Sequence, residues 1–433
     1  MPRRNTPAGR ALSMATLGGG IAGRYAGYLL QRAFLGKHAG DRKLKAVHAV
    51  TARMMRDRMQ ALRGPAMKLG QTLSLQSGVL PDEMLAELTA LQMQAPGMHS
   101  SLVRAQVRTG LGHEPEAIFR AFSPEPVAAA SLGQVHRAVL PTGEDVAVKV
   151  QYPAIRDAID NDFAWFRAVS KPAQASGHVP KAALDELQEQ IVAETDYTRE
   201  ARNIEFFGTG LAPLSYVQVP RVYKRYSSAT ILTMSWMPGV HLEQFLSRRP
   251  SQSQRDEIGS RLFEMFYFQI LRLAALHADP HWGNYLFRDD RSIGLVDFGC
   301  VKYFTPSFVR NMRSVFLYPG DRRGPEFQRL LEERHGLSAS KLTPAVKRAL
   351  MDFAENFYRR VYPPEPDRQK QPFNFGDATF LQQYLRESRK LLRSRGVLTD
   401  YLFLARAEMG LYHTLHKLRA RVFTSALVRK HMR

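Results

Sequence analysis

Cysteine, acidic side chains and long apolar runs are scarce in this 433-residue chain. Its one cysteine, Cys300, excludes an intramolecular disulfide and fits a reducing compartment. Asp and Glu total 40 against 61 Lys and Arg, so the net charge of +21 indicates an anionic partner. Because zinc-finger and RNP-type patterns are also missing, we expect no nucleic-acid partner and favour an anionic membrane lipid.

No apolar run near the C-terminus is long enough to span a bilayer, and the run near the N-terminus, residues 11–30, is interrupted by Arg24. An Arg there costs about 2.5–3.5 kcal/mol on insertion. We therefore predict an interfacial helix or a weakly inserted anchor, with a flexible glycine-rich tail as the alternative, and a cytoplasmic protein at the membrane periphery. Gly19, Gly23 and Gly27 recur every four residues, which lets two helices pack closely and is compatible with a homodimer.

The central motif is HADPHWGN, residues 277–284, which is followed by DFG at residues 297–299. Asp279 and Asn284 have the spacing of the catalytic-loop Asp and Asn of protein kinases, and Asp297 stands where the second Mg²⁺ ligand stands. The spacing predicts that Asp279 orients the attacking group while Asn284 and Asp297 hold Mg²⁺ on the phosphates of ATP or ADP.

The motif has two other interpretations. Chance matching is disfavoured because the two pieces occur in order and flank two apolar runs joined by a polar turn at residues 288–292, which predicts a hairpin. A zinc site of His277, Asp279 and His281 lacks a further ligand at metal spacing. We interpret His277 as a structural residue that braces the loop.

After Pro124 the sequence changes to short strands, and a turn at residues 141–144 predicts a β-hairpin. Lys149 interrupts its second apolar strand. In kinases such a Lys holds the α- and β-phosphates and pairs with a helix Glu. Where kinases have a glycine-rich loop, this chain has an alanine-rich loop before the first strand. Alanines restrict how closely the backbone N–H groups can approach phosphates, so this loop indicates that the nucleotide is held differently from the way typical kinases hold it. That loop is Ala128, Ala129, Ala130 and Ser131.

A helix is predicted over residues 181–207, with three carboxylates of which one should neutralise Lys149. These are Glu194, Asp196 and Glu200. Two further strands follow, and the second ends at a hinge, Met237–Pro238–Gly239.

The C-terminal half is predicted to be helical. A helix over residues 254–273 should deliver the catalytic loop, and Thr305 should cap the next helix. A last helix should carry Leu411, Leu415, Leu418 and Val422 on one stripe. The chain lacks an A-P-E motif and the Arg of H-R-D, and both absences argue against peptide substrates.

Together these pieces resemble the UbiB/AarF/ADCK family of atypical protein-kinase-like proteins over about residues 50–310. Besides the motifs above, the resemblance rests on K-L-G-Q, in which Lys68 and Gln71 share one helix face. It implies that this helix folds over the nucleotide site and occludes peptides. It further implies that Lys68 contacts Glu194 and Asp196, while Glu200 pairs with Lys149.

The resemblance also implies a function: family members bind ATP and Mg²⁺, hydrolyse ATP, sit on membranes and are associated with ubiquinone and other isoprenoid-lipid metabolism. We expect a membrane-associated atypical kinase or ATPase whose partner is an anionic lipid or an isoprenoid or quinone precursor. The alternatives are a small-molecule phosphotransferase, which an acidic substrate cleft would mark, and a catalytically silent, nucleotide-gated lipid-binding scaffold.

The predicted architecture is α+β, predominantly helical and bilobal, like a protein kinase with a helical K-x-G-Q extension. The predicted domains are a basic, glycine-rich membrane-associating segment (1–45), the helical extension (46–123), an N-lobe (124–239) and a helical C-lobe (240–433).

Overall fold

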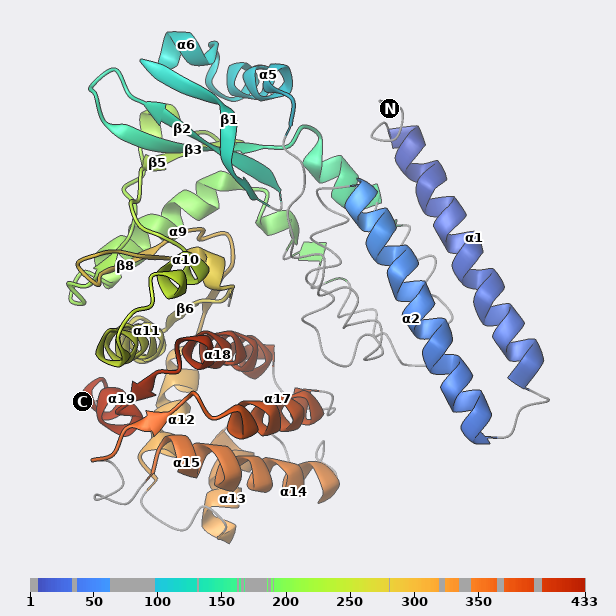
Figure 1. Ribbon diagram of the computed structural model, residues 1–433, viewed down its shortest axis with the longest axis vertical. Coiled ribbons are helices and arrows are strands. Elements are labelled where there is room, and N and C mark those ends of the chain that lie inside the picture. Colours follow the sequence, from blue (N-terminus) through green and yellow to red (C-terminus); the bar gives the residue numbers. More distant parts are fainter. Residues whose placement is uncertain are drawn as a thin grey trace. The chain divides into compact units, whose positions relative to one another are not determined.

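The computed structural model describes residues 7–432 apart from 33–36, 63–97, 131, 162, 165–166, 168–184, 186–187, 190, 280, 319–323, 335–343, 364–369 and 393–398. Lys68, Gln71 and Ser131 therefore lie outside the described residues. The chain forms two compact units, one of residues up to Arg199 with Val222–Trp236, the other of Glu200–Arg221 with residues from Met237 onward. The described part is mainly helical with small sheets, which confirms the α+β prediction (Figure 1).

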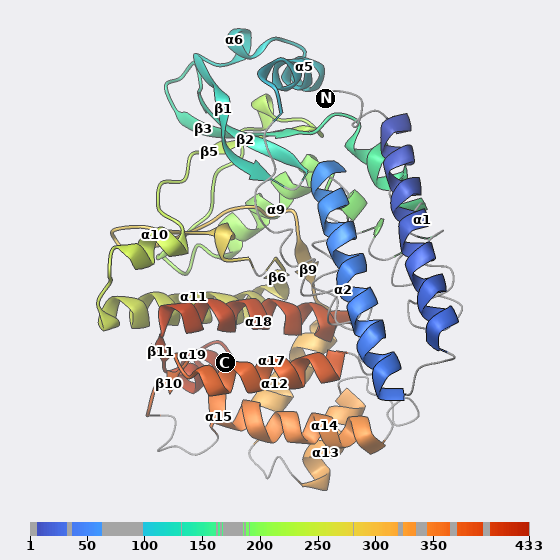
Figure 2. The ribbon, with the colours of Figure 1, turned by 45° about the vertical axis from the view of Figure 1, so that its right-hand side comes forward.

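The N-terminal unit begins with two helices, α1 (Pro7–Arg32) and α2 (Lys37–Leu62), which lie side by side (Figures 1 and 2). Buried Leu17 and Tyr28 of α1 lie at helical spacing, so the flexible-tail alternative is wrong. The predicted glycine stripe is not the contact between these helices. Gly20 approaches Met54 instead, whereas a Cβ added at Gly19, Gly23 or Gly27 would meet no atom within 4 Å.

No helix in the described part of the chain combines the length and apolar content that crossing a bilayer requires.

A four-stranded antiparallel sheet is the second main part of this unit. Its order is β1 (Ala121–Ala130), β2 (Gly133–Val139), β3 (Asp145–Gln151) and β5 (Ile231–Ser235). The predicted β2–β3 hairpin is confirmed. Helix α5 (Ser100–Leu111) packs Val103 and Val107 into one apolar cluster with the sheet; the short helices α6 (Pro115–Ile118) and η3 (Lys224–Tyr226) complete this part of the unit.

The prediction that the alanine-rich segment is a loop before the first strand is wrong. Ala128, Ala129 and Ala130 are the end of β1, where they pair with Val135, Gln134 and Gly133 of β2. Gly133 is needed at this turn because a Cβ there would lie 2.3 Å from the carbonyl oxygen of Val150.

Strand β2 of this sheet carries a buried histidine, His136. The Nδ1–H of His136 donates to the Ser123 carbonyl at 2.8 Å, so its Nε2 accepts from Gln134 at 2.7 Å. Burial lowers the pKa of His136, which keeps the ring neutral.

The predicted helix over residues 181–207 is also not continuous. The chain turns at Glu194–Asp196, and α9 (Tyr197–Gly210) begins afresh. The side chain of Asp196 explains the break, because its carboxylate accepts from the backbone N–H of Thr198 at 2.9 Å and from its hydroxyl at 2.6 Å.

The C-terminal unit is built around α11 (Gln252–Leu273), whose residues are buried almost continuously from Ile258 to Leu271. This confirms the predicted core helix, although Leu273 is only half-buried. Ala274 follows in a left-handed conformation (φ 49°) and turns the chain into β6 (Ala275–His277).

Short strands and helices surround α11. The strands pair as β4 (Val217–Gln218), β8 (Ile293–Leu295) and β7 (Tyr285–Phe287), as β6 with β9 (Val301–Tyr303), and as β10 (Phe373–Asn374) with β11 (Arg421–Val422). The remaining elements are α10 (Leu242–Ser247), η4 (Trp282–Asn284), α12 (Pro306–Phe316), α13 (Pro325–Arg334), α14 (Pro344–Phe353), the π-helix η5 (Ala354–Tyr358), α15 (Arg359–Val361), α17 (Ala378–Leu392), α18 (Thr399–Leu418) and α19 (Thr424–Lys430).

Two predictions about helix ends have different outcomes here. Thr305 caps α12 by accepting from the Phe308 N–H at 3.2 Å, as predicted. The single last helix is wrong: α18 ends at Leu418, Arg419 adopts φ 49°, and Val422 is buried from strand β11.

A buried carboxylate lies in the core of the C-terminal unit. Glu408 of α18 accepts hydrogen bonds from the hydroxyls of Tyr267 (2.7 Å), Tyr384 (2.6 Å) and Tyr412 (3.2 Å). Burial raises the pKa of Glu408, although the three hydroxyls lower it in part.

Candidate active site

The loop between β6 and β7 carries the HADPHWGN motif and folds back on itself. The carboxylate of Asp279 accepts from the Asn284 side chain at 2.9 Å and from the His281 N–H at 3.3 Å. His281 Nδ1 in turn accepts from the Gly283 N–H at 3.0 Å. Gly283 allows this approach, because a Cβ there would lie 2.7 Å from His281 Nδ1. The structure therefore brings Asp279 and Asn284 together.

Asp297 is held close to this loop by backbone contacts. The predicted β7–β8 hairpin is confirmed, and the Val296 N–H donates to the Asn284 carbonyl at 2.9 Å. His277 is buried and its Nε2–H donates to the Asp297 carbonyl at 2.6 Å, which confirms its structural role. Asp297 has φ 62°, an uncommon conformation that short polar side chains tolerate and that often occurs at functional sites.

Helix α9 holds the next residue of the DFG motif. Glu200 Oε1 accepts from the Phe298 N–H at 3.2 Å, and Asn203 donates to the Phe298 carbonyl at 2.9 Å. Asn203 also accepts from the Tyr303 hydroxyl at 2.8 Å. The sequence patterns did not single out Asn203, although its place three residues after Glu200 puts both side chains on one face of α9.

The magnesium prediction fits the donor atoms of Asn284 and Asp297. Because Nδ2 of Asn284 is committed to Asp279, its oxygen is the end available to a metal, and Asp297 adds a carboxylate. Mg²⁺ bound to nucleotide phosphates commonly uses one or two such protein oxygens. Within the described residues, no three His, Cys, Asp or Glu side chains gather as a separate metal site.

The N-terminal unit holds the other predicted site residues. Lys149 in β3 is 6% exposed, and its Nζ lies 5.2 Å from the ring centre of Tyr197. Glu194 and Asp196 lie in the turn before α9. The pairing of Lys149 with Glu200, like the contact of Lys68 with Glu194 and Asp196, stays a prediction.

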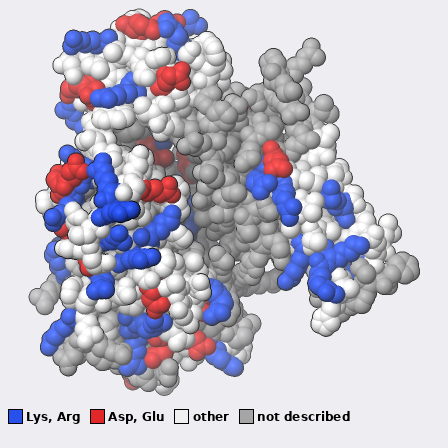
Figure 3. Space-filling view, viewed as in Figure 1, with Lys and Arg blue, Asp and Glu red and all other residues white. Residues whose placement is uncertain are grey.

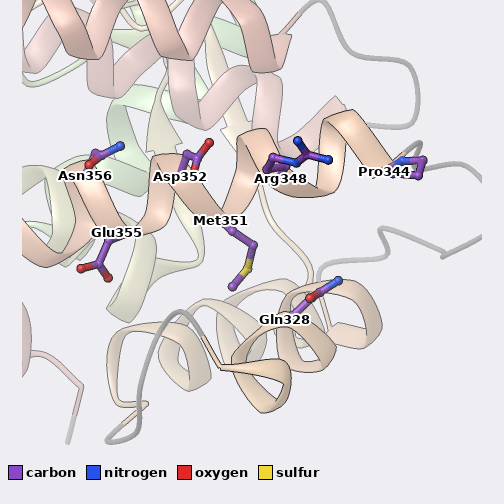
Figure 4. Close-up of a pocket in the computed structure, with 7 residues that line it drawn as sticks. All are labelled: Gln328, Pro344, Arg348, Met351, Asp352, Glu355 and Asn356. Atoms are coloured by element: carbon purple, nitrogen blue, oxygen red, sulfur yellow. The ribbon is translucent and has the colours of Figure 1, made fainter.

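A separate pocket lies in the C-terminal unit, near α13, α14 and η5. It has a volume of about 470 Å³, and Met351 points from α14 towards α13 (Figure 4). Its lining contains none of the predicted site residues: Gln328, Pro344, Arg348, Met351, Asp352, Glu355 and Asn356.

Comparison with known proteins identifies the family. Residues 90–322, more than half of the chain, match the ABC1 atypical kinase-like domain. The chain belongs to the ABC1 atypical kinase-like family. This confirms the resemblance to the UbiB/AarF/ADCK proteins and the kinase-like fold predicted from the motifs.

Two curated relatives in the ABC1 family illustrate the similarity. Protein ACTIVITY OF BC1 COMPLEX KINASE 8, chloroplastic, of Arabidopsis thaliana is 32% identical over 72% of this chain and 42% of its own length. Atypical kinase COQ8, mitochondrial, of Saccharomyces cerevisiae is 30% identical over 70% of this chain and 61% of its own. The chain thus spans about half the length of the curated relatives it matches.

A solved structure has a similar fold. The complex of Rv3197 with erythromycin from Mycobacterium tuberculosis is 27% identical in sequence and covers 85% of this chain and 92% of that one, with a TM-score of 0.62. The fold shared with that structure therefore extends well beyond the residues that carry the motifs.

Proposed function

We propose that this ABC1 protein is a membrane-associated atypical kinase or ATPase that binds Mg-ATP and supports ubiquinone or other isoprenoid-lipid biosynthesis. In this proposal Asp279 orients the attacking group, Asn284 and Asp297 supply oxygen ligands to Mg²⁺, and Lys149 contacts the phosphates. The single observation that carries it is the Asp279–Asn284 hydrogen bond of 2.9 Å in a loop braced on Asp297 by His277.

The acceptor is proposed to be a small lipid-like molecule or water. A peptide acceptor is disfavoured by the missing A-P-E motif and by Ala278, which stands where H-R-D kinases have Arg. The ubiquinone connection rests on the family and is a proposal for this chain.

The membrane role is supported by the surface of α1 and α2. Leu29 and Leu30 are 61% and 74% exposed at the end of α1, where Arg32 is also exposed. Lys and Arg predominate among the charged side chains on the face of this helix pair seen in Figure 3. Exposed leucines beside cations suit the interface of an anionic bilayer.

The membrane proposal is tested by liposome flotation. Leu29→Glu with Leu30→Glu should abolish binding to anionic liposomes and leave the melting temperature unchanged. A matched control is Leu102→Glu, because Leu102 is 48% exposed on α5. If the α1 double variant floats like the wild type, the basic faces elsewhere in the chain become the candidate.

The enzymatic proposal is tested by Mg-ATP turnover of the purified protein, with and without anionic liposomes and a quinone-precursor-like phenol. Turnover should rise with both additions and vanish in Asp297→Asn. That variant should still bind ATP, but with lower affinity than the wild type. Nucleotide binding without turnover under every condition would reject the enzyme and favour the nucleotide-gated scaffold. Turnover coupled to phosphorylation of a soluble hydroxylated molecule would favour the phosphotransferase.

A further inference from the structure

Trp282 in the HADPHWGN loop is contacted by a helix far along the chain. Its ring stacks on the ring of His413 from α18, with centres 5.5 Å apart and planes 14° apart. The ammonium of Lys417, one turn further along α18, lies 3.9 Å from the centre of the same Trp282 ring. On its own loop Trp282 also stacks on His281, at 4.9 Å and 24°. Two residues of α18 and one of the loop therefore converge on one indole.

Helix α18, which carries His413 and Lys417, is anchored in the core of the C-terminal unit. Leu411, Leu415 and Leu418 of α18 are at most 4% exposed, and Glu408 ties the same helix to buried tyrosines. His413 and Lys417 are four residues apart, so they project from one face of the helix, opposite the face that buries Leu411, Leu415 and Leu418. Lys417 is further restrained by Glu243 of α10, 3.8 Å away.

Movement of Trp282 would pass directly to the residues of the site. Gly283, the next residue, donates its N–H to His281, and the residue after that, Asn284, donates to Asp279. Trp282, Gly283 and Asn284 form the single turn η4, so a displacement of the Trp282 backbone changes these two hydrogen bonds.

We propose that His413 and Lys417 are positioning residues, which hold the catalytic loop in its working geometry through Trp282. The inference rests on the proposed function insofar as Asp279 and Asn284 serve a magnesium nucleotide. Both residues act through the indole. An aromatic ring and a cation are the two partners that an indole face attracts most strongly, which explains this choice of side chains.

The test uses matched pairs of variants in the full chain. Lys417→Met removes the charge and Lys417→Arg keeps a cation that can stack; His413→Leu removes the ring and His413→Phe keeps it. Arg421→Met is the control, since Arg421 is an exposed cation just beyond α18. Amide hydrogen exchange of residues 277–285 is the first readout, because it reports loop order without requiring activity.

We expect faster loop exchange in Lys417→Met and His413→Leu, and wild-type exchange in Lys417→Arg, His413→Phe and Arg421→Met. Turnover should fall about two- to thirtyfold in the first pair, mainly in kcat, which is the effect of losing one cation–π or ring contact. In a Trp282→Leu background, Lys417→Met should have no additional effect on exchange or turnover, because the two residues act in series.

Each outcome is decisive. Unchanged loop exchange in both Lys417→Met and His413→Leu overturns the inference, whatever the activity. Altered exchange with wild-type turnover also overturns it, since the loop would then not depend on this contact for catalysis. If the wild type shows no turnover but its Mg²⁺-dependent nucleotide affinity falls in the same two variants, the proposed enzymatic function fails while the positioning role stands. An additive effect of Lys417→Met in the Trp282→Leu background would show that Lys417 acts by another route and reject the proposal.

Discussion

Replacing Asn203 with Leu should loosen the DFG segment, because it removes one of the two hydrogen bonds through which α9 holds Phe298 and leaves the bond from the Phe298 N–H to Glu200. Asn203 is 3% exposed and bonds to two groups, the Phe298 carbonyl at 2.9 Å and the Tyr303 hydroxyl at 2.8 Å. A leucine has similar volume but no polar atom, so both partners lose a bond. Phe298 is 0% exposed, whereas Tyr303 is 48% exposed and its hydroxyl can bond to water instead.

The expected magnitude follows from that difference. A buried carbonyl left without a donor costs about 1–3 kcal/mol, while an exposed hydroxyl costs little, so the variant should lose about 2 kcal/mol of unfolding free energy. The carbonyl belongs to the residue after Asp297, so the position of the carboxylate should change with it. We therefore expect Mg²⁺-nucleotide affinity to fall by at least about tenfold, the equivalent of about 1.4 kcal/mol.

The assay compares nucleotide-induced thermal stabilisation, with and without Mg²⁺, and urea unfolding. Tyr303→Phe is the matched control, because it removes the Asn203–Tyr303 bond and keeps the bond to Phe298; it should bind nucleotide like the wild type. If Asn203→Leu and Tyr303→Phe behave alike in both measurements, the bond to the Phe298 carbonyl does not position the motif, and the reasoning is refuted.

Three further predictions concern stability. For Glu408, burial raises the folded-state pKa above the unfolded value, so its contribution to stability is present below the unfolded pKa and is lost as pH rises through the folded pKa. The unfolding free energy measured in urea should therefore fall as pH rises above the unfolded pKa, and Glu408→Gln should make this fall less steep. For His136 the folded pKa is lowered, so its contribution to stability is present above the unfolded pKa of about 6.5 and is lost as pH falls below that value. His136→Gln should remove that loss. An unchanged slope of unfolding free energy against pH would contradict a neutral, buried His136. Gly133→Ala should lower the unfolding free energy by about 3 kcal/mol, because the added Cβ would meet the backbone of Val150. Gly19→Ala should be neutral or stabilising, because its added Cβ meets no atom within 4 Å. Equal melting temperatures for the two variants would contradict this prediction.

The parts of the site that the sequence predicted well are those encoded by neighbouring residues. Asp279 and Asn284 lie five positions apart in one loop, so their spacing alone indicates that they meet. The β7–β8 hairpin and the Thr305 cap are local in the same way, because turn residues and capping side chains act within a few residues of themselves.

The errors arose where a side-chain hydrogen bond or strand pairing overrode the pattern of the sequence. The residues around Asp196 are compatible with a continuous helix. The Asp196 carboxylate instead accepts hydrogen bonds from the backbone N–H and the hydroxyl of Thr198, which begins a new helix, α9, directly after it. The alanines of residues 128–130 suggested a loop, yet their backbone groups pair with β2. Leu411 to Val422 kept a helical period by coincidence, since Val422 is buried by strand pairing after the reversal at Arg419.

The contacts that hold the motif could not be predicted at all, because they join residues far apart in sequence. Asn203 and Phe298 are 95 residues apart, and no periodicity relates α18 to Trp282. The two supports also differ in kind. The α9 contacts are buried hydrogen bonds, whose loss leaves a desolvated polar group, whereas the α18 contacts are half-exposed ring and cation contacts, whose loss is partly compensated by water. Substitutions on α9 should therefore change global stability and metal-nucleotide affinity together, and substitutions at His413 or Lys417 should change loop order and turnover while the unfolding free energy stays nearly constant.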